Sequence, residues 1–339
     1  MSARVELLPR IAQRLLTTRT LIATHMNPDG DAAGSALGLL NLLRANRCKH
    51  TPQVYCRDSL PLTYEFLPGS GFWSLDLPEL DDIDTVVVID CGGPHRVSKD
   101  FEAWCQQFER EKRGVTAVLD HHIIDRPWGD LPFVRVESAA ASEVACELAQ
   151  AAGWQIDSSA AQCLYTGLVT DTGSFRHSNT SAKVLELASM LVARGASPYT
   201  ISQTIYNAED PRRLQTLGKV LESLRLGQPP EGKANWASVI LREAWLPAGA
   251  KPGEVSDDFV EYPRSVRGVG IAFQIKERVR DGGCKVSLRS SIEYDVQTIA
   301  AQFQGGGHRQ AAGGFIPTTD VEEAHRRVRV AVEAALWGR

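Results

Sequence analysis

Short apolar runs alternate with stretches of helical periodicity between residue 20 and about residue 136. The runs are TLIATH (20–25), QVYC (53–56), TVVVID (85–90), VTAVLD (115–120) and FVRV (133–136). Four of the five are rich in β-branched residues, which is typical of strands buried on both faces. Strands that alternate with helices form parallel sheets covered on both sides. The pattern predicts an α/β fold with a doubly wound, mostly parallel five-stranded sheet.

Residues 140–226 change to helical periodicity, and QPPEGKAN (228–235) has the composition of a linker. A second alternating region follows, with strands expected within 234–243, 268–277 and 284–291 and helices over 295–303 and 321–337. The length of 339 residues also favours two domains. We predict one domain over 1–205, a helical linker over 206–232 and a smaller α/β domain over 233–339.

Composition excludes several classes of protein. The net charge of −4 and the pI of about 6.1 argue against stable binding of duplex DNA, which requires many basic contacts to phosphate. No apolar run approaches the ~20 residues that span a bilayer, and arginines interrupt the N-terminal stretch where a signal peptide would be apolar. We therefore expect a cytoplasmic protein with no membrane partner.

The seven cysteines are odd in number and include no CxxC pair. This usage fits a reducing compartment better than a disulfide framework or a thiolate zinc site. We expect the cysteines to be small buried apolar residues.

Acidic and histidine side chains follow three of the predicted strands. In open parallel sheets, ligands bind outside the carboxyl ends of the strands. Each group taken alone is explained by a turn or a helix cap, but three strands that deliver such groups to one sheet edge indicate a site. The candidates are His25, Asp29 and Asp31 after the first run, Asp90 after the third, Asp120, His121 and His122 after the fourth, and Asp171 from the helical region.

Four aspartates in one cluster carry four negative charges, and two divalent cations would neutralise them. The imidazoles of His25 and His121 complete a mixed nitrogen and oxygen set, which suits Mn²⁺ better than Mg²⁺. Two metals ~3.5–4 Å apart can deprotonate a bridging water that attacks phosphorus. The cluster therefore predicts a phosphohydrolase with two divalent ions, most favourably Mn²⁺.

Five motifs resemble those of the DHH phosphoesterase family, in matching order. They are HMNPDGD (25–31), VVVIDCGG (86–93), LDHH (119–122), VTDTGSF (169–175) and GGGHRQAAGG (305–314), the last being similar to the signature of the DHH-associated C-terminal domain. The resemblance covers nearly the whole chain and is nearest to the nanoRNase and pAp phosphatase group. It implies a DHH catalytic domain over 1–205 and a substrate-binding domain over 233–339.

The resemblance also implies a role for each matching residue. One metal ion would be bound by His25, Asp29 and Asp90, and the other by Asp31, Asp90, His121 and Asp171. Three residues would be catalytic: Asp90 as the bridging ligand, Asp120 as the residue that orients His121, and His122 as a charge stabiliser or proton donor at the scissile phosphate.

Substrate contacts are predicted mainly in the C-terminal domain. Three glycines let backbone N–H groups approach an anion, although a plain glycine turn is the alternative. Arginines could supply forked contacts to phosphate or lie on the solvated surface. The predicted substrate-binding residues are Asn27, Arg264, Arg289, Gly305, Gly306, Gly307 and His308. Asn27 could equally stabilise its own loop, and His177 has no assigned role.

The expected substrates are short oligoribonucleotides, degraded to mononucleotides, and 3'-phosphoadenosine 5'-phosphate (pAp), converted to AMP. Alternative enzymes with the same cluster are a cyclic or linear dinucleotide phosphodiesterase and a pyrophosphatase, and the GGGH motif argues against the latter. An alternative of another class is a non-catalytic nucleotide-binding regulator. Dimers occur among similar proteins, and the sequence leaves a homodimer open.

Overall fold

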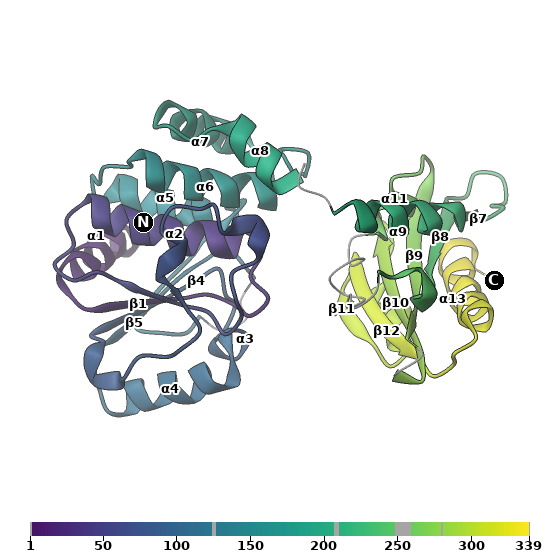
Figure 1. Cartoon of the computed structure of the whole chain (residues 1–339), viewed down its shortest axis with the longest axis horizontal. Helices are drawn as coiled ribbons and strands as arrows, with labels where there is room; N and C mark the ends of the chain where they lie inside the picture. The colour runs from purple at the N-terminus through teal and green to yellow at the C-terminus, as the bar shows by residue number, and fades with distance from the viewer. Residues whose placement is uncertain (1, 124–126, 207–209, 248–258, 279–280, 339) are drawn as a thin grey trace. The chain divides into compact units, whose positions relative to one another are not determined.

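The computed structural model describes residues 2–123, 127–206, 210–247, 259–278 and 281–338. The chain forms two compact units, Met1–Ala208 and Glu209–Arg339 (Figure 1). No helix within the described ranges is long and apolar enough to cross a membrane. All seven cysteines are free, and six of them are buried.

The first unit is built on a parallel sheet with strand order β3-β2-β1-β4-β5-β6. The sheet has six strands where the sequence predicts five, because the short β3 adds an edge strand beside β2. A two-residue strand leaves no periodicity to detect. The strands are β1 (Thr20–Ala23), β2 (Gln53–Tyr55), β3 (Trp73–Ser74), β4 (Thr85–Ile89), β5 (Val115–Asp120) and β6 (Leu131–Val134).

Helices cover both faces of this sheet, as the doubly wound prediction requires (Figure 1). One face carries α1 (Ser2–Thr17), α2 (Gly30–Ala45), α5 (Ala141–Ala151) and α6 (Ser158–Asp171), with α7 (Ala182–Ala193) and α8 (Pro198–Tyr206) outside α6. The other face carries α3 (Pro94–Val97) and α4 (Lys99–Arg110). Each face has its own apolar core, and all residues of β4 are buried between them.

The second unit contains a mixed sheet with strand order β11-β12-β10-β9-β8-β7, in which only β8 and β9 run parallel. Its strands are β7 (Arg225–Leu226), β8 (Asn235–Leu241), β9 (Val269–Arg278), β10 (Gly283–Ser290), β11 (Gly306–His308) and β12 (Ala311–Ile316). Its helices are α9 (Pro211–Glu222), α11 (Glu261–Arg264), α12 (Gln297–Ala301) and α13 (Val321–Trp337).

Two apolar clusters stabilise the second unit. Residues of α12 and α13 pack against one face of the sheet, which includes Phe273 and Val286. Residues of α9, which begins directly after the start of this unit, pack with Val239 and Phe259 on the other face. The α9 segment therefore contributes to the core of the second unit.

Candidate metal centre

Three neighbouring strands of the first sheet end in the predicted ligands. His25 lies two residues beyond β1, Asp90 directly follows β4, and Asp120 is the last residue of β5. The strand order reverses between β1 and β4, and the edge outside such a switch point is where open α/β sheets bind ligands. The parallel strands thus bring side chains from distant parts of the chain to one edge.

Close packing of α2 on α6 brings two further aspartates together. A Cβ on Gly34 would lie 2.6 Å from both the Cys163 carbonyl oxygen and the Gly167 nitrogen, so the helices can touch only because this residue has no side chain. The helices run antiparallel, and the start of α2 therefore lies beside the end of α6. Asp31 and Asp171 occupy these two ends.

The first ligand set contains His25, Asp29 and Asp90. The Nε2 atom of His25 lies 3.6 Å from Asp90 Oδ2 and 3.9 Å from Asp29 Oδ1. The Nδ1 atom of the same ring lies 2.9 Å from the Met26 carbonyl oxygen, the partner that a metal-bound imidazole usually has. Asp29 also caps α2, since its Oδ1 accepts hydrogen bonds from the Asp31 and Ala32 N–H groups, both at 3.0 Å.

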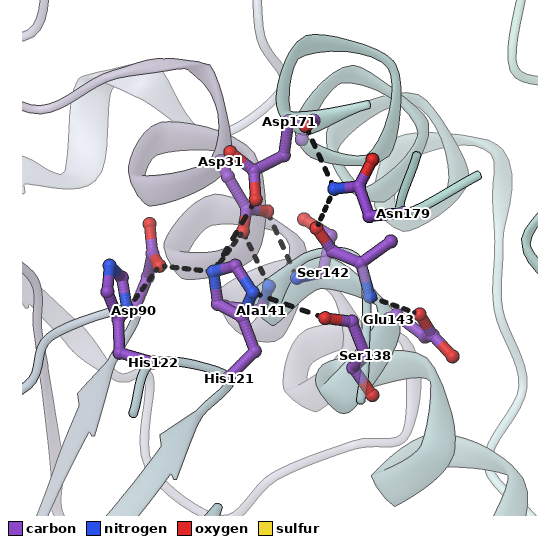
Figure 2. Close-up of polar contacts among 12 residues, drawn as sticks. Asp31, Asp90, His121, His122, Ser138, Ala141, Ser142, Glu143, Asp171 and Asn179 are labelled. Carbon is purple, nitrogen blue, oxygen red and sulfur yellow. Dashed lines mark hydrogen bonds and ion pairs between the residues drawn. The ribbon is translucent and has the colours of Figure 1, made fainter. Parts of the chain in front are cut away.

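The second ligand set contains Asp31, His121 and Asp171, and the other oxygen of Asp90 faces it (Figure 2). His121 Nε2 lies 3.4 Å from Asp90 Oδ1, 3.5 Å from Asp171 Oδ2 and 3.9 Å from Asp31 Oδ2. Within each set the ligand atoms lie within 4.8 Å of one another. The structure thus brings all six predicted metal ligands together, with one oxygen of Asp90 toward each histidine.

Asp90 has the features expected of a carboxylate that bridges two cations. It is 2% exposed, and its Oδ1 accepts no hydrogen bond among the described residues, although His121 Nε2 lies 3.4 Å and His122 Nδ1 lies 3.7 Å from it. Its φ of 55° is left-handed, a conformation that costs a non-glycine residue about 1–2 kcal/mol. A buried acceptor without a donor is costly, and a metal ion would satisfy it. The residues present therefore fit a pair of divalent ions.

The pKa values of the clustered side chains also indicate that the carboxylates of the second ligand set require a balancing positive charge. Burial raises the pKa of Asp31 well above its usual value, and the charges of Asp90 and Asp171 raise it further. Burial and the neighbouring Asp90 raise the pKa of Asp171 to about 6. Burial alone would lower the pKa of His121, but the nearby carboxylates of Asp90 and Asp31 raise it to about 10.

The role predicted for Asp120 is wrong in one respect. The side chain of Asp120 contacts the ring of His122, not that of His121: His122 Nδ1 lies 2.8 Å from Asp120 Oδ1. This oxygen also accepts hydrogen bonds from the backbone N–H groups of both histidines, at 2.7 and 3.1 Å. The imidazole of His121 instead faces the Ser138 carbonyl oxygen, 3.3 Å from its Nδ1. Asp120 therefore orients His122 and leaves the Nε2 of that ring free to face a ligand.

In the second unit, the strand register places two predicted substrate contacts on one face. Arg289 of β10 is paired with Ala311 of β12, and Ala311 is paired with His308 of β11. Residues paired across adjacent strands project on the same side. Arg289 and His308 are therefore two strands apart, at about 10 Å, with the small side chain of Ala311 between them.

Within the GGGH segment, Gly306–His308 form the strand β11 and Gly305 directly precedes it, where the sequence suggested a loop or turn. A Cβ on Gly305 would collide with the Gly313 carbonyl oxygen, and one on Gly307 would lie 2.6 Å from that of Ala311. These two glycines are required for close pairing of β11 with β12. Gly306 is exposed, and no heavy atom of the described residues beyond its chain neighbours lies within 4 Å of a Cβ built on it, so the space on that side of β11 is open.

Several contacting residues were not predicted. Glu261 joins the two predicted arginines, since Arg289 Nε donates to its Oε1 at 2.9 Å and Arg264 Nη1 donates to its Oε2 at 2.8 Å. Asp58 Oδ2 accepts a 2.7 Å hydrogen bond from the Asn27 backbone, which has a left-handed φ of 53°. His177 packs on Gly173, two residues beyond Asp171.

The loop that follows β6 was also missed as part of the site. The Ser138 carbonyl oxygen faces His121, and Asn179 donates a hydrogen bond to the Asp171 carbonyl oxygen (Figure 2). Glu143 accepts a hydrogen bond from the Ala139 N–H in the same segment. One signal was available in the sequence, because Glu143 is the one charged residue in the stretch of small and apolar residues SAAASEVAC (138–146).

Comparisons with known proteins agree with this arrangement. The model of the DHH family, N-terminal domain, matches residues 19–168, and that of the DHHA1 domain matches residues 244–334. The bifunctional oligoribonuclease and PAP phosphatase NrnA of Thermus thermophilus is 31% identical over 315 residues, which are 93% of this chain and 89% of the relative. The chain belongs to the DHH family.

Other DHH relatives differ in length and described activity. The bifunctional oligoribonuclease and PAP phosphatase NrnA of Bacillus subtilis is 26% identical, with 88% of this chain and 90% of the relative covered. The cyclic-di-AMP phosphodiesterase GdpP of Geobacillus thermodenitrificans is 24% identical over 93% of this chain but only 47% of the relative.

Among solved structures, an exopolyphosphatase-related protein from Bacteroides fragilis is similar, with a TM-score of 0.82 and 25% identity. The alignment covers 98% of this chain and 96% of that chain. The similarity supports the α/β fold described above.

Proposed function

We propose that this DHH protein is a metal-dependent phosphohydrolase that degrades short oligoribonucleotides to mononucleotides and hydrolyses pAp to AMP and phosphate. The observation that carries the proposal is the pair of ligand sets joined by the two oxygens of Asp90. Its substrates are proposed from the relatives described as oligoribonucleases and PAP phosphatases.

The proposed metal ligands are the six residues of the two sets. His25, Asp29 and Asp90 would hold one divalent ion, and Asp31, Asp90, His121 and Asp171 the other. Two imidazoles among carboxylates favour Mn²⁺ over Mg²⁺. When bound, such a pair supplies Lewis acidity toward the phosphate and makes a water molecule acidic enough to serve as the nucleophile.

His122 is the proposed proton donor or charge stabiliser for the leaving group. Its Nδ1 proton is held by Asp120, which is fully buried and already accepts two backbone hydrogen bonds. This contact orients the ring so that Nε2 is the atom available to the substrate. To donate a proton, the ring would be in its imidazolium form, with the Nδ1 proton held by Asp120 and the Nε2 proton passing to the leaving oxygen. The arrangement suits transfer of a proton to an oxygen that leaves phosphorus.

The second unit is proposed to bind the nucleotide and its phosphates. Arg289 and His308 share one face, and the space where a side chain of residue 306 would project is open. Arg264 is the second proposed phosphate contact, held by the same Glu261 as Arg289. In the first unit, the left-handed backbone of Asn27 presents a further proposed contact.

An assay of the purified protein tests this function. With Mn²⁺, the protein should release mononucleotides from di- to pentaribonucleotides and AMP from pAp, and chelation of the metal should abolish both reactions. Asp90→Asn should be inactive, because an amide cannot bridge two cations as a carboxylate does. Failure of the metal-loaded protein on both substrates would contradict the substrate assignment.

Cyclic di-AMP and a linear dinucleotide belong in the same assay, because a GdpP relative aligns with most of this chain. Preferential cleavage of either would favour the dinucleotide phosphodiesterase alternative. Tight nucleotide binding with no turnover of any substrate would favour the non-catalytic regulator.

A further inference from the structure

The segment from Ser138 to Ser142, which we name the 138–142 loop, contacts two ligands of the second set directly (Figure 2). Asp31 Oδ2 accepts a hydrogen bond from the Ala141 N–H at 2.5 Å, and Asp31 Oδ1 accepts one from the Ser142 N–H at 3.0 Å. At the other end of the loop, the Ser138 carbonyl oxygen faces His121 Nδ1. The loop thus fixes the direction of both carboxylate oxygens of Asp31 and of the His121 ring.

Asn179 connects the same loop to the third ligand. Its Nδ2 lies 3.2 Å from the Ala139 carbonyl oxygen and 3.2 Å from that of Asp171, so the amide can donate one hydrogen to each (Figure 2). The 138–142 loop is therefore joined to Asp31, His121 and Asp171.

The loop has no corresponding link to the first ligand set. Among the described residues, His25 is oriented by the Met26 carbonyl, and Asp29 bonds to backbone N–H groups of α2. A displacement of the loop would therefore disturb one ligand set and leave the other largely in place.

Glu143 holds the backbone of the loop through a buried hydrogen bond. It is 4% exposed, and its Oε2 accepts a hydrogen bond from the Ala139 N–H at 2.8 Å. Its Oε1 lies 2.8 Å from Nζ of Lys183, which compensates the buried charge. A carboxylate is costly to bury, and this one holds the backbone on which the second set depends.

We propose that Glu143 is a positioning residue for a divalent transition-metal ion in the Asp31, Asp90, His121 and Asp171 set. Glu143 acts through the 138–142 loop on Asp31 and His121, and Asn179 links that loop to Asp171. The inference rests on the proposed function, because it assumes that two ions bind. Loss of partners beyond the direct ligands typically weakens metal binding by about 10–100-fold.

The test is a titration of the full-length, metal-stripped protein with Mn²⁺. Calorimetry measures the affinity and number of bound ions, and electron paramagnetic resonance measures whether the ions are coupled. Wild type should bind two ions and give the spectrum of a coupled pair. Glu143→Ala should bind one ion with unchanged affinity and the other about 10–100-fold more weakly, so that a single-ion spectrum appears at limiting Mn²⁺. Glu143→Gln should restore the coupled pair, because its amide oxygen can accept from Ala139.

Two further variants keep the inference falsifiable. Asn179→Ala removes an exposed side chain, which the fold should tolerate, and should selectively weaken the same ion. Glu147→Ala is the matched control, one helical turn along α5 and facing Lys183 at 4.0 Å, with no hydrogen bond to the loop among the described residues. It should bind both ions as wild type does.

The outcomes separate this inference from the proposed function. The positioning role would be overturned if Glu143→Ala folds and binds both ions as wild type does. It would also be overturned if Glu143→Gln binds Mn²⁺ as weakly as Glu143→Ala. If Glu143→Ala does not fold, unchanged metal binding by Asn179→Ala overturns it. Absence of Mn²⁺ binding or turnover in wild type would instead refute the proposed function itself.

Discussion

At the residue scale, the cluster is an arrangement of acids and imidazoles that lie close enough to share protons. The Nε2 atoms of His25 and His121 face opposite oxygens of Asp90, and the Nδ1 atoms face backbone carbonyl oxygens. The carboxylates keep the His121 imidazole protonated, since they raise its pKa to about 10 despite burial. A metal ion must replace this proton, because only neutral imidazole can coordinate.

Metal binding should therefore release protons. At about pH 7.5, which is below the pKa of His121, the imidazole is charged, and binding of Mn²⁺ should release about one proton from it. The affinity should rise with pH, and below about pH 6 it should fall further as Asp171 becomes protonated. Calorimetric titration in buffers of different ionisation enthalpy measures the release. An observed enthalpy independent of buffer and an affinity independent of pH would contradict this account.

At the element scale, the contact between α2 and α6 determines where two of the ligands lie. The helices are buried and approach closely at Gly34, which has the Gly167 and Cys163 backbones as its neighbours. Asp31 is in the first turn of α2, and Asp171 is the last residue of α6. A change in the separation of the helices would therefore move the two carboxylates apart.

Gly34→Ala should destabilise the first unit and weaken metal binding. The added Cβ would lie 2.6 Å from two backbone atoms, which cannot rotate away as a side chain would. Overpacking of this kind typically costs about 1–3 kcal/mol in the free energy of unfolding, measurable by urea denaturation. Gly218→Ala, in the exposed face of α9 with open space around it, is the control and should stabilise by about 0.5–1 kcal/mol. Equal effects of the two substitutions would refute the packing argument.

At the scale of the whole molecule, the proposed metal ligands and the proposed phosphate-binding side chains belong to different compact units. All six ligands lie in Met1–Ala208, whereas Arg264, Arg289 and His308 lie in Glu209–Arg339. Glu261 accepts a hydrogen bond from one N–H of each arginine, and the Leu288 carbonyl oxygen accepts another from Arg289 Nη1 at 3.0 Å. A guanidinium group has five N–H donors, so each arginine keeps further donors for a phosphate. Chemistry and substrate affinity should therefore respond to different substitutions.

Arg289→Ala should raise KM by about 10-fold or more, because a hydrogen bond to a charged group contributes about 1.5–3 kcal/mol, while the bound Mn²⁺ per chain stays at the wild-type value. Steady-state kinetics on pAp and metal analysis of the same preparation measure both quantities. The control is Arg225→Ala. Arg225 lies on β7, at the opposite edge of the second sheet from β11, and forms an ion pair with Glu322 of α13. An unchanged KM for Arg289→Ala, or the same increase in both variants, would exclude a substrate contact at Arg289.

The sequence alone determined the doubly wound sheet and the convergence of the ligands. Both follow from local information, because hydrophobic periodicity identifies parallel strands and the carboxyl ends of such strands meet at one edge. Residues placed one or two positions beyond strand ends, such as His25, Asp90 and His121, are therefore predicted to form one cluster from the sequence pattern alone, and they lie together in the structure.

Only the tertiary structure decided which second partner each ligand has. Asp120 orients His122 and not His121, and a loop more than 100 residues away in sequence binds both oxygens of Asp31. The contacts of Asp31 are with backbone N–H groups, which every residue except proline possesses, so residue type does not reveal them. They depend on how closely segments pack, as at Gly34, and packing is a property of the folded chain.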